Sequence, residues 1–207
     1  IAGNHDNPER LCAASPLTYR NGIYLLGYPA SDAGVYSSGN GEIRILQSGS
    51  GWLELRVPGS SCSAVVLTMP YPSESRLEQV LSDEAKEETL GKAYSDKIAG
   101  VFQKLSSHFR DDTVNLVMAH LFMAGGKESE SERTIQVGGA MTVHPSALPA
   151  HAHFAALGHL HRPQQIKTAP CPAYYSGSPL AYSFSESDYA KALYIVDAEP
   201  GKPADIR

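Results

Sequence analysis

Two histidines separated by one residue, His159 and His161, follow an apolar run that ends at Gly158. Residues two apart on an extended chain point to the same side, so both imidazoles can face one pocket. Their separation, roughly 7 Å along a strand, suits two metal ions about 3.5–4 Å apart, each bound by one imidazole. An isolated His-x-His more often lies in a loop, solvated or hydrogen-bonded to backbone. The rest of the chain must therefore decide between these two interpretations.

Side chains with ligand atoms also follow two other predicted strands. Asn4 and His5 come after a short apolar start and a glycine, and His120 ends the continuous apolar run 113–119. Because the carboxyl ends of strands in an α/β sheet lie along one edge, we expect these side chains to converge with the histidine pair. Imidazole and amide oxygen donors, together with carboxylates, favour manganese, iron or zinc over calcium or a sulfur-bound metal.

The elements that must position these residues alternate between strands and helices. Asn7 followed by Pro8 predicts a helix start, because an N-cap side chain precedes a proline whose missing N–H costs nothing at the first helical position, and this helix ends before Pro16. The stretch 75–109 predicts two helices that break near Ser82-Asp83. Strands are predicted over 23–26, 43–46, 52–57, 64–69, 113–119, 153–157, 173–176 and 192–197. This alternation is typical of an α/β or α+β fold with a mixed sheet.

The composition excludes several classes of protein. A chain of 207 residues corresponds to one domain of ordinary size, and no window approaches the 18 consecutive apolar residues of a membrane span. The three cysteines are far apart and form no Cys-x-x-Cys pair, which argues against a disulfide framework or a zinc ribbon and favours a reducing cytoplasm. The net charge of −5 provides no basic stripe for nucleic acid, so metal ions must supply positive charge if the protein handles phosphate. The first residue is Ile1 and not Met, which indicates an internal piece of a longer protein.

Six phrases of the sequence resemble those of one known family. They are GNHDNPERL at 3–11, AHLF at 119–122, SESE at 129–132, GHLHRPQ at 158–164, YSGSPL at 175–180 and YSFS at 182–185. In this order they resemble motifs of the calcineurin-like metallophosphoesterases, and most closely the SbcD family, the nuclease subunits of bacterial SbcC/SbcD complexes. The resemblance implies an αββα sandwich of mixed β-sheets that is incomplete at the N-terminus. Residues 1–207 would form part of a single nuclease domain, with the capping domain absent.

The resemblance also assigns roles to the residues at matching positions. Four side chains would bind two divalent metal ions, with manganese expected: Asn4, His120 and His159 would hold one ion, and His161 the other. His5 would be the catalytic histidine, which stabilises the transition state or protonates the leaving oxygen. Asp6, the second residue predicted to be catalytic, would orient the loop or His5.

The function implied by the resemblance is that of a metal-dependent DNA exonuclease and endonuclease in DNA repair and recombination. Its partners would be DNA and an SbcC-type ATPase subunit, with a homodimer formed through the helices after residue 6, a cytoplasmic location and no membrane contact. The family has an Asp-x-His and a metal-bridging Asp before the Gly-Asn-His-Asp motif, at which this sequence begins. We therefore expect that this chain alone binds metal weakly and is inactive. Two alternatives stay open, a small-molecule phosphodiesterase or phosphatase of the same fold and a non-catalytic fragment that only binds a partner.

The remaining polar candidates have weaker sequence signals. Arg10 and Arg162 flank the predicted site and suit either a phosphate contact or a plain salt bridge. The run 129–133 is expected to be a loop that could lie over the site. Four histidines match no motif and are not predicted to be ligands: His108, His144, His151 and His153.

Overall fold

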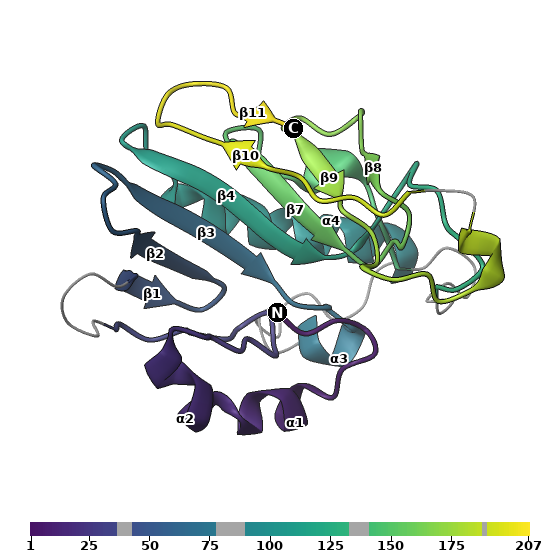
Figure 1. The fold of residues 1–207 in the computed structure, drawn as a ribbon, viewed down its shortest axis with the longest axis horizontal. Helices are drawn as coiled ribbons and strands as arrows, with labels where there is room; N and C mark the ends of the chain where they lie inside the picture. The colour runs from purple at the N-terminus through teal and green to yellow at the C-terminus, as the bar shows by residue number, and fades with distance from the viewer. Residues whose placement is uncertain (37–42, 78–89, 133–140, 188–189) are drawn as a thin grey trace.

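The computed structural model describes residues 1–36, 43–77, 90–132, 141–187 and 190–207, which form an α/β fold around one large mixed sheet (Figure 1). This seven-stranded sheet has the order β1-β2-β3-β4-β7-β9-β8. Its strands are β1 (Arg44–Gly49), β2 (Trp52–Arg56), β3 (Ser63–Met69), β4 (Thr113–His120), β7 (Phe154–Gly158), β8 (Gln164–Gln165) and β9 (Ala173–Tyr175). Two two-stranded sheets accompany it, β5 (Phe122–Met123) with β6 (Thr142–Val143) and β10 (Val196–Asp197) with β11 (Asp205–Ile206). The α/β class with mixed sheets that the sequence predicted is confirmed.

The centre of the large sheet is parallel, and this determines where loops gather. β3, β4, β7 and β9 are neighbours that run in the same direction. In the register of β4 and β7, His120 lies opposite Gly158. The carboxyl ends of the parallel strands therefore form one edge of the sheet, on the right in Figure 1.

Over the residues that the structure describes, the helices are few and mostly short. They are α1 (Pro8–Ala13), α2 (Ser15–Thr18), α3 (Glu74–Leu77) and α4 (Leu90–Leu105), with 3₁₀ turns η1 (Tyr19–Asn21), η3 (Ser106–His108), η4 (Pro145–Ala147) and η5 (Phe184–Glu186). The predicted cap of α1 is confirmed, because the side-chain oxygen of Asn7 accepts a hydrogen bond from the backbone N–H of Arg10 at 2.9 Å. None of the described helices combines the length and apolarity needed to cross a bilayer.

Three sequence-based expectations for the elements need comment. The strand predicted over 23–26 is wrong, because this segment joins no sheet and instead accepts one backbone hydrogen bond at Leu26 from Ala2 (2.8 Å). Of the strand predicted over 192–197, only the last two residues form a strand, β10, although Ile195 also exchanges two backbone hydrogen bonds with Arg207 (2.8 and 2.9 Å). The break predicted near Ser82-Asp83 lies outside the described residues.

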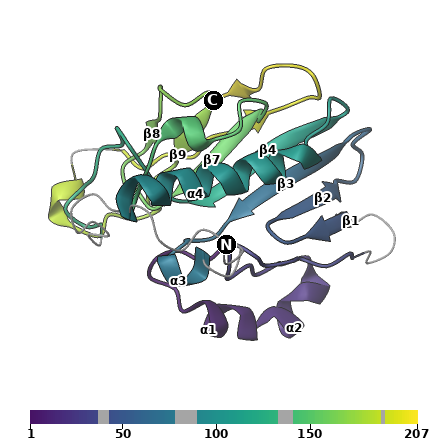
Figure 2. The ribbon, with the colours of Figure 1, turned by 180° about the vertical axis from the view of Figure 1, so that it is seen from behind.

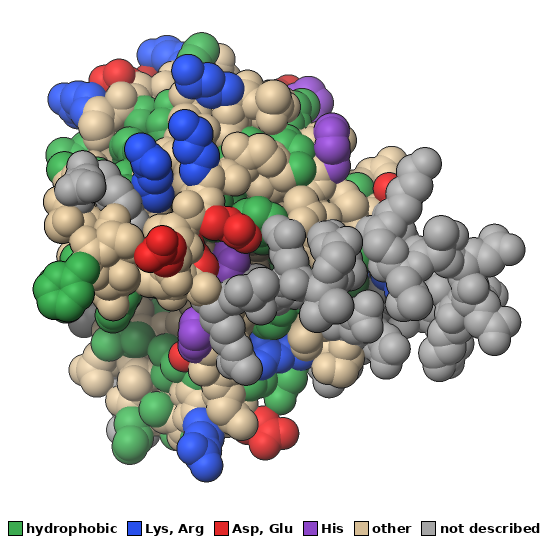
Figure 3. Space-filling model, turned by 90° about the vertical axis from the view of Figure 1, so that its right-hand side faces the viewer, with side chains coloured by type: hydrophobic (Ala, Val, Ile, Leu, Met, Phe, Trp, Pro, Cys, Tyr) green, Lys and Arg blue, Asp and Glu red, His purple; other side chains and the backbone are tan. Residues whose placement is uncertain are grey.

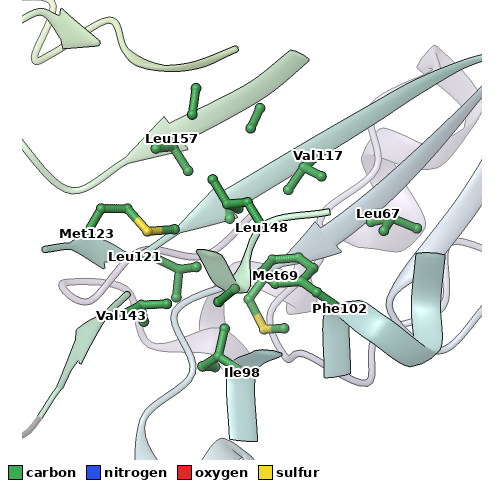
Figure 4. Close-up of a cluster of buried hydrophobic side chains, with 14 of the residues drawn as sticks. Leu67, Met69, Ile98, Phe102, Val117, Leu121, Met123, Val143, Leu148 and Leu157 are labelled. Carbon is green, nitrogen blue, oxygen red and sulfur yellow. The ribbon is translucent and has the colours of Figure 1, made fainter. Parts of the chain in front are cut away.

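The main hydrophobic core lies between the large sheet and α4, which covers one face of the sheet (Figure 2). α4 buries side chains at helical spacing: Tyr94, Ile98, Val101, Phe102 and Leu105. Figure 4 shows Ile98 and Phe102 of this helix among Leu67, Met69, Val117 and Leu157 from the central strands. This packing fixes the parallel strands and therefore the edge at which they end.

Candidate metal centre

The carboxyl edge of the parallel strands carries a hollow of about 260 Å³. Its lining brings together residues from distant parts of the chain: Asn4, His5, His120, Glu132, His159 and His161, with residues 176–179 and Tyr182. Histidine and acidic side chains lie close together near the middle of this face in Figure 3. Five of the six side chains predicted for the site thus line one hollow, while Asp6 does not.

The ring of His120 is held against the first motif by contacts on several sides. Its Nε2 atom lies 2.9 Å from Oδ1 of Asn4. A Cβ placed on Gly3 would lie 2.8 Å from Cε1 of the ring, and a Cβ on Gly158 would lie 2.9 Å from Nδ1. These distances are too short for any larger residue unless the ring moves, so the glycines of two separate motifs make room for one imidazole.

Backbone hydrogen bonds hold Asn4 at this position. Ala2 is fully buried, and its N–H donates to the carbonyl of Leu26 at 2.8 Å while its carbonyl accepts from the N–H of Tyr71 at 2.9 Å. Asp6 closes the loop, since its Oδ2 atom accepts a hydrogen bond from the N–H of Gly3 at 2.7 Å. Asp6 therefore shapes the loop that carries Asn4 and His5.

Burial makes the two central histidines poor bases. Burial lowers the pKa of His120 to about 4, and the proximity of His159 lowers it further. Burial also lowers the pKa of His159 to about 4, while the nearby carboxylate of Glu132 opposes this shift. Both imidazoles are therefore neutral at pH 7, which is the form that binds metal ions.

The backbone at His159 is unusual. Among the described residues, His159 is the only one other than glycine with a positive φ, at 113°. Such a conformation costs of order 1–3 kcal/mol and persists where the surroundings enforce it, often at functional sites. Here it follows directly after the end of β7 and places a buried imidazole beside His120, with ring centroids 5.6 Å apart.

The donor set of Asn4, His120 and His159 fits one divalent ion. Two ligand atoms that share an octahedral ion at about 2.1 Å lie about 3 Å apart, close to the 2.9 Å between Asn4 and His120. Two imidazoles bound at about 2.1 Å can have ring centroids up to about 6.5 Å apart, and 5.6 Å lies within this limit. Within the described part of the chain, however, no three His, Cys, Asp or Glu side chains are grouped as a metal site. The amide of Asn4 is therefore needed to complete a set of three donors.

His161 lies in the same hollow but has different partners. Its Nδ1 atom is 2.6 Å from Oγ of Ser131 and 3.2 Å from Oε1 of Glu186. Its backbone N–H donates to Oε1 of Glu132 at 2.6 Å. The SESE run therefore lies against the site as expected, although Arg133 falls outside the described residues.

Sequence reasoning missed the two acidic residues at this site, Glu132 and Glu186. Glu132 belongs to the SESE phrase and Glu186 directly follows the YSFS phrase, so both lay in segments that the motifs had marked. The spacing of these residues in the sequence gave no sign that they meet at His161. Their assignment needed the three-dimensional structure.

Three of the histidines that match no motif have structural partners elsewhere. His108 stacks on Trp52 with ring centroids 3.8 Å apart. Nδ1 of His144 accepts a hydrogen bond from the backbone N–H of Ser146 at the start of η4, and Nδ1 of His153 accepts one from the N–H of Asn115 at 2.9 Å.

Comparison with known proteins gives a consistent result. No family model matches the chain. It is 49% identical over 204 residues to the SbcD subunit of the SbcCD nuclease from Bacillus subtilis, an alignment that covers 99% of this chain and 47% of that protein. It is 28% identical over 199 residues to the protein of the same name from Staphylococcus epidermidis, covering 96% of this chain and 45% of that protein. The chain thus spans about half the length of these curated relatives, and the resemblance to the SbcD family is confirmed.

Proposed function

We propose that this chain is part of a metal-dependent DNA nuclease subunit that hydrolyses phosphodiester bonds in repair and recombination with an SbcC-type ATPase. The observation that carries the proposal is the convergence of Asn4, His120, His159 and His161 on one hollow, in a chain homologous to proteins named as nuclease subunits. The proposal includes the single-domain organisation of residues 1–207. A cytoplasmic location and pairing of subunits rest on the resemblance alone.

In the proposed site, two divalent ions, with manganese expected, would lie between the four ligands. Asn4, His120 and His159 would hold one ion and His161 the other. When bound, such a pair of ions supplies positive charge for the phosphate and lowers the pKa of a water nucleophile. Because the chain carries a net charge of −5, this positive charge is needed before a polyanion can approach the hollow closely.

The chain's own residues would orient the substrate and move a proton. His5 is exposed and lines the hollow, so its imidazole can reach a leaving 3′ oxygen and protonate it. Asp6 holds the backbone of Gly3 and thereby fixes the loop that carries His5. Nη2 of Arg76 donates a hydrogen bond to the carbonyl oxygen of Asp6 at 3.1 Å. Because Arg76 belongs to α3, this bond ties the loop to that helix.

We further propose that this chain alone binds metal weakly and is inactive. His161 would be the sole ligand of its ion among the four assigned residues, and one imidazole binds a divalent ion poorly at millimolar concentrations or below. The relatives are about twice as long as the chain, which leaves room for further ligands in the complete nuclease.

The test is cleavage of a DNA substrate during a manganese titration. It is performed on this chain and on a longer chain that includes the upstream part of the aligned relatives. Manganese-dependent cleavage by the longer chain alone supports the proposal. A longer chain that hydrolyses only small phosphoesters would identify a phosphodiesterase or phosphatase of the same fold. If neither chain cleaves any phosphoester, the nuclease assignment fails in favour of a partner-binding fragment.

A further inference from the structure

A carboxylate without an assigned role lies buried behind His161. Glu186 is 1% exposed, and its Oε1 atom is 3.2 Å from Nδ1 of His161. A buried carboxylate is costly unless charged or polar partners compensate it. The hydrogen-bond partners of its two carboxylate oxygens therefore indicate the role of Glu186.

One carboxylate oxygen of Glu186, Oε2, accepts hydrogen bonds from groups that compensate its negative charge. Oε2 of Glu186 accepts from Nζ of Lys191 at 2.5 Å and from the backbone N–H of Tyr182 at 3.3 Å, and it lies 3.4 Å from Oγ of Ser178. The Lys191 ammonium thus forms an ion pair with a carboxylate that is fully buried, and an ionised carboxylate can only accept hydrogen bonds.

The other oxygen acts on the ring of His161 through a hydrogen-bond chain. The hydroxyl of Ser131 donates to Oε1 of Glu186, and its oxygen lies 2.6 Å from Nδ1 of His161. Because the Ser131 proton points to the carboxylate, the Ser131 oxygen presents a lone pair to the ring. Both the direct contact and the bridged one therefore require a proton on Nδ1, so in the neutral imidazole the free lone pair is on Nε2.

We propose that Glu186 is a positioning residue that fixes the Nδ1–H tautomer of His161 and so presents Nε2 to a metal ion in the hollow. This inference rests on the proposed function only in the identity of that ion. Ligating histidines commonly donate their second ring N–H to a carboxylate, which orients the ring and strengthens the ligand. Ser131 bridges the two groups, and Lys191 forms an ion pair with the other carboxylate oxygen of Glu186.

The direct test is the tautomer of His161, read from the ¹⁵N shifts of its two ring nitrogens in the metal-free chain at neutral pH. The unmodified chain is expected to carry the proton on Nδ1. Glu186→Gln introduces an amide that can donate, so a population with the proton on Nε2 is expected. Glu186→Asp keeps an acceptor and is expected to retain the Nδ1 proton. Glu132→Gln is the matched control, because that carboxylate contacts the backbone of His161 and not its ring.

The proposal can still be tested if the Glu186→Gln variant does not fold. If Glu186→Gln does not fold because it removes the carboxylate that compensates the Lys191 charge, the paired variant E186Q/K191M removes both charges and is expected to show the same change of tautomer. An Nε2 proton in the unmodified chain overturns the proposal, and so does an unchanged Nδ1 proton in a folded Glu186→Gln or paired variant.

A second readout separates this inference from the function. Manganese affinity, measured by calorimetry on the longer chain, is expected to fall about 10- to 100-fold in Glu186→Gln. An affinity equal to that of the unmodified protein overturns the positioning role. If the unmodified longer chain binds no manganese while the tautomer behaves as expected, it is the proposed function that fails, and the control of the ring by Glu186 stands.

Discussion

Replacing Gly158 by alanine should disturb His120 while leaving the backbone of β7 in place. Gly158 has an ordinary negative φ, because it is not among the glycines with positive values, so alanine meets no backbone strain there. The new Cβ would instead lie 2.9 Å from Nδ1 of His120, whereas ordinary contacts begin at 3.4 Å. The ring must therefore move by about 0.5 Å, and Gly3 leaves it little room on another side.

The expected loss of stability follows from two opposing effects. Forcing a methyl group into a packed site costs about 1–3 kcal/mol. Replacing glycine by alanine lowers the entropy of the unfolded chain, which stabilises the folded state by about 0.4–1 kcal/mol. The net loss in the free energy of unfolding should thus be about 1–2 kcal/mol. If His120 binds manganese as proposed, its displacement should also weaken manganese binding about 10- to 100-fold, by analogy with the loss of groups that orient metal ligands.

Urea denaturation of the metal-free chain, combined with a double-mutant cycle, tests this reasoning. In a His120→Ala background the clash is absent, so Gly158→Ala should no longer destabilise, and the coupling between the two sites should be about 2 kcal/mol. The matched control is Gly100→Ala in α4, where nothing lies within 4 Å of the added Cβ and alanine should stabilise the helix by about 1 kcal/mol. Equal destabilisation by Gly158→Ala with and without the His120 ring would refute the packing argument.

Three further predictions concern the scaffold. Tyr175→Phe removes a buried hydroxyl that donates to the carbonyl of Leu121 (2.5 Å) and accepts from the N–H of Met123 (3.1 Å). The free energy of unfolding in urea should fall by about 1–3 kcal/mol, and an unchanged value would show that water replaces the hydroxyl. Phe102→Ala should cost about 3–5 kcal/mol in the same assay, because this ring is fully buried between α4 and the sheet, and a loss below about 1 kcal/mol would contradict this packing. Hydrogen bonds from Arg110 hold the pKa of Glu54 below its usual value of 4.5, so Glu54→Gln should destabilise by about 1–3 kcal/mol at neutral pH. Because a lowered carboxylate pKa adds stability only above the unfolded value, this difference should shrink as pH falls below 4.5, and a difference that grows in acid would refute the assignment.

Much of the fold could be predicted because apolar periodicity determines which segments are buried. The run 113–119 and the strand ending at Gly158 are central strands in which every second residue is buried, while Leu116, Met118 and Ala156 between them are half-buried or exposed. The segment 23–26 has similar apolar residues but pairs with no strand; its backbone bonds to the N–H of Ala2 at Leu26 and to the carbonyl of Thr18 at Ile23. Residue type alone does not distinguish these cases, because both segments are apolar but differ in burial, with Ile23 exposed, and in their hydrogen-bond partners.

The site was predictable to the extent that its residues end parallel strands. His120 ends β4 and His159 follows β7, and adjacent parallel strands bring their carboxyl ends together whatever lies between them in the sequence. Glu132 and Glu186 come from a loop and from a 3₁₀ turn, whose paths no periodicity determines. Site residues in loops, such as these two, are therefore identified only from a three-dimensional structure that positions the loops relative to the strands.

At this edge of the sheet, the need for space and the need for a positive φ fall on different residues, which the motifs alone do not reveal. A glycine beside a ligand suggests a turn that needs positive φ, yet neither Gly3 nor Gly158 has one, and the residue that does is His159. The glycines are therefore required for space, since a Cβ on either would lie within 3 Å of the ring of His120. The strain is carried by His159 itself, whose positive φ directly after β7 accompanies a buried ring 5.6 Å from that of His120. The motifs that contain Gly3 and Gly158 thus both determine the position of the His120 ring. A substitution at either glycine should therefore be detectable at His120, which ends the neighbouring strand β4.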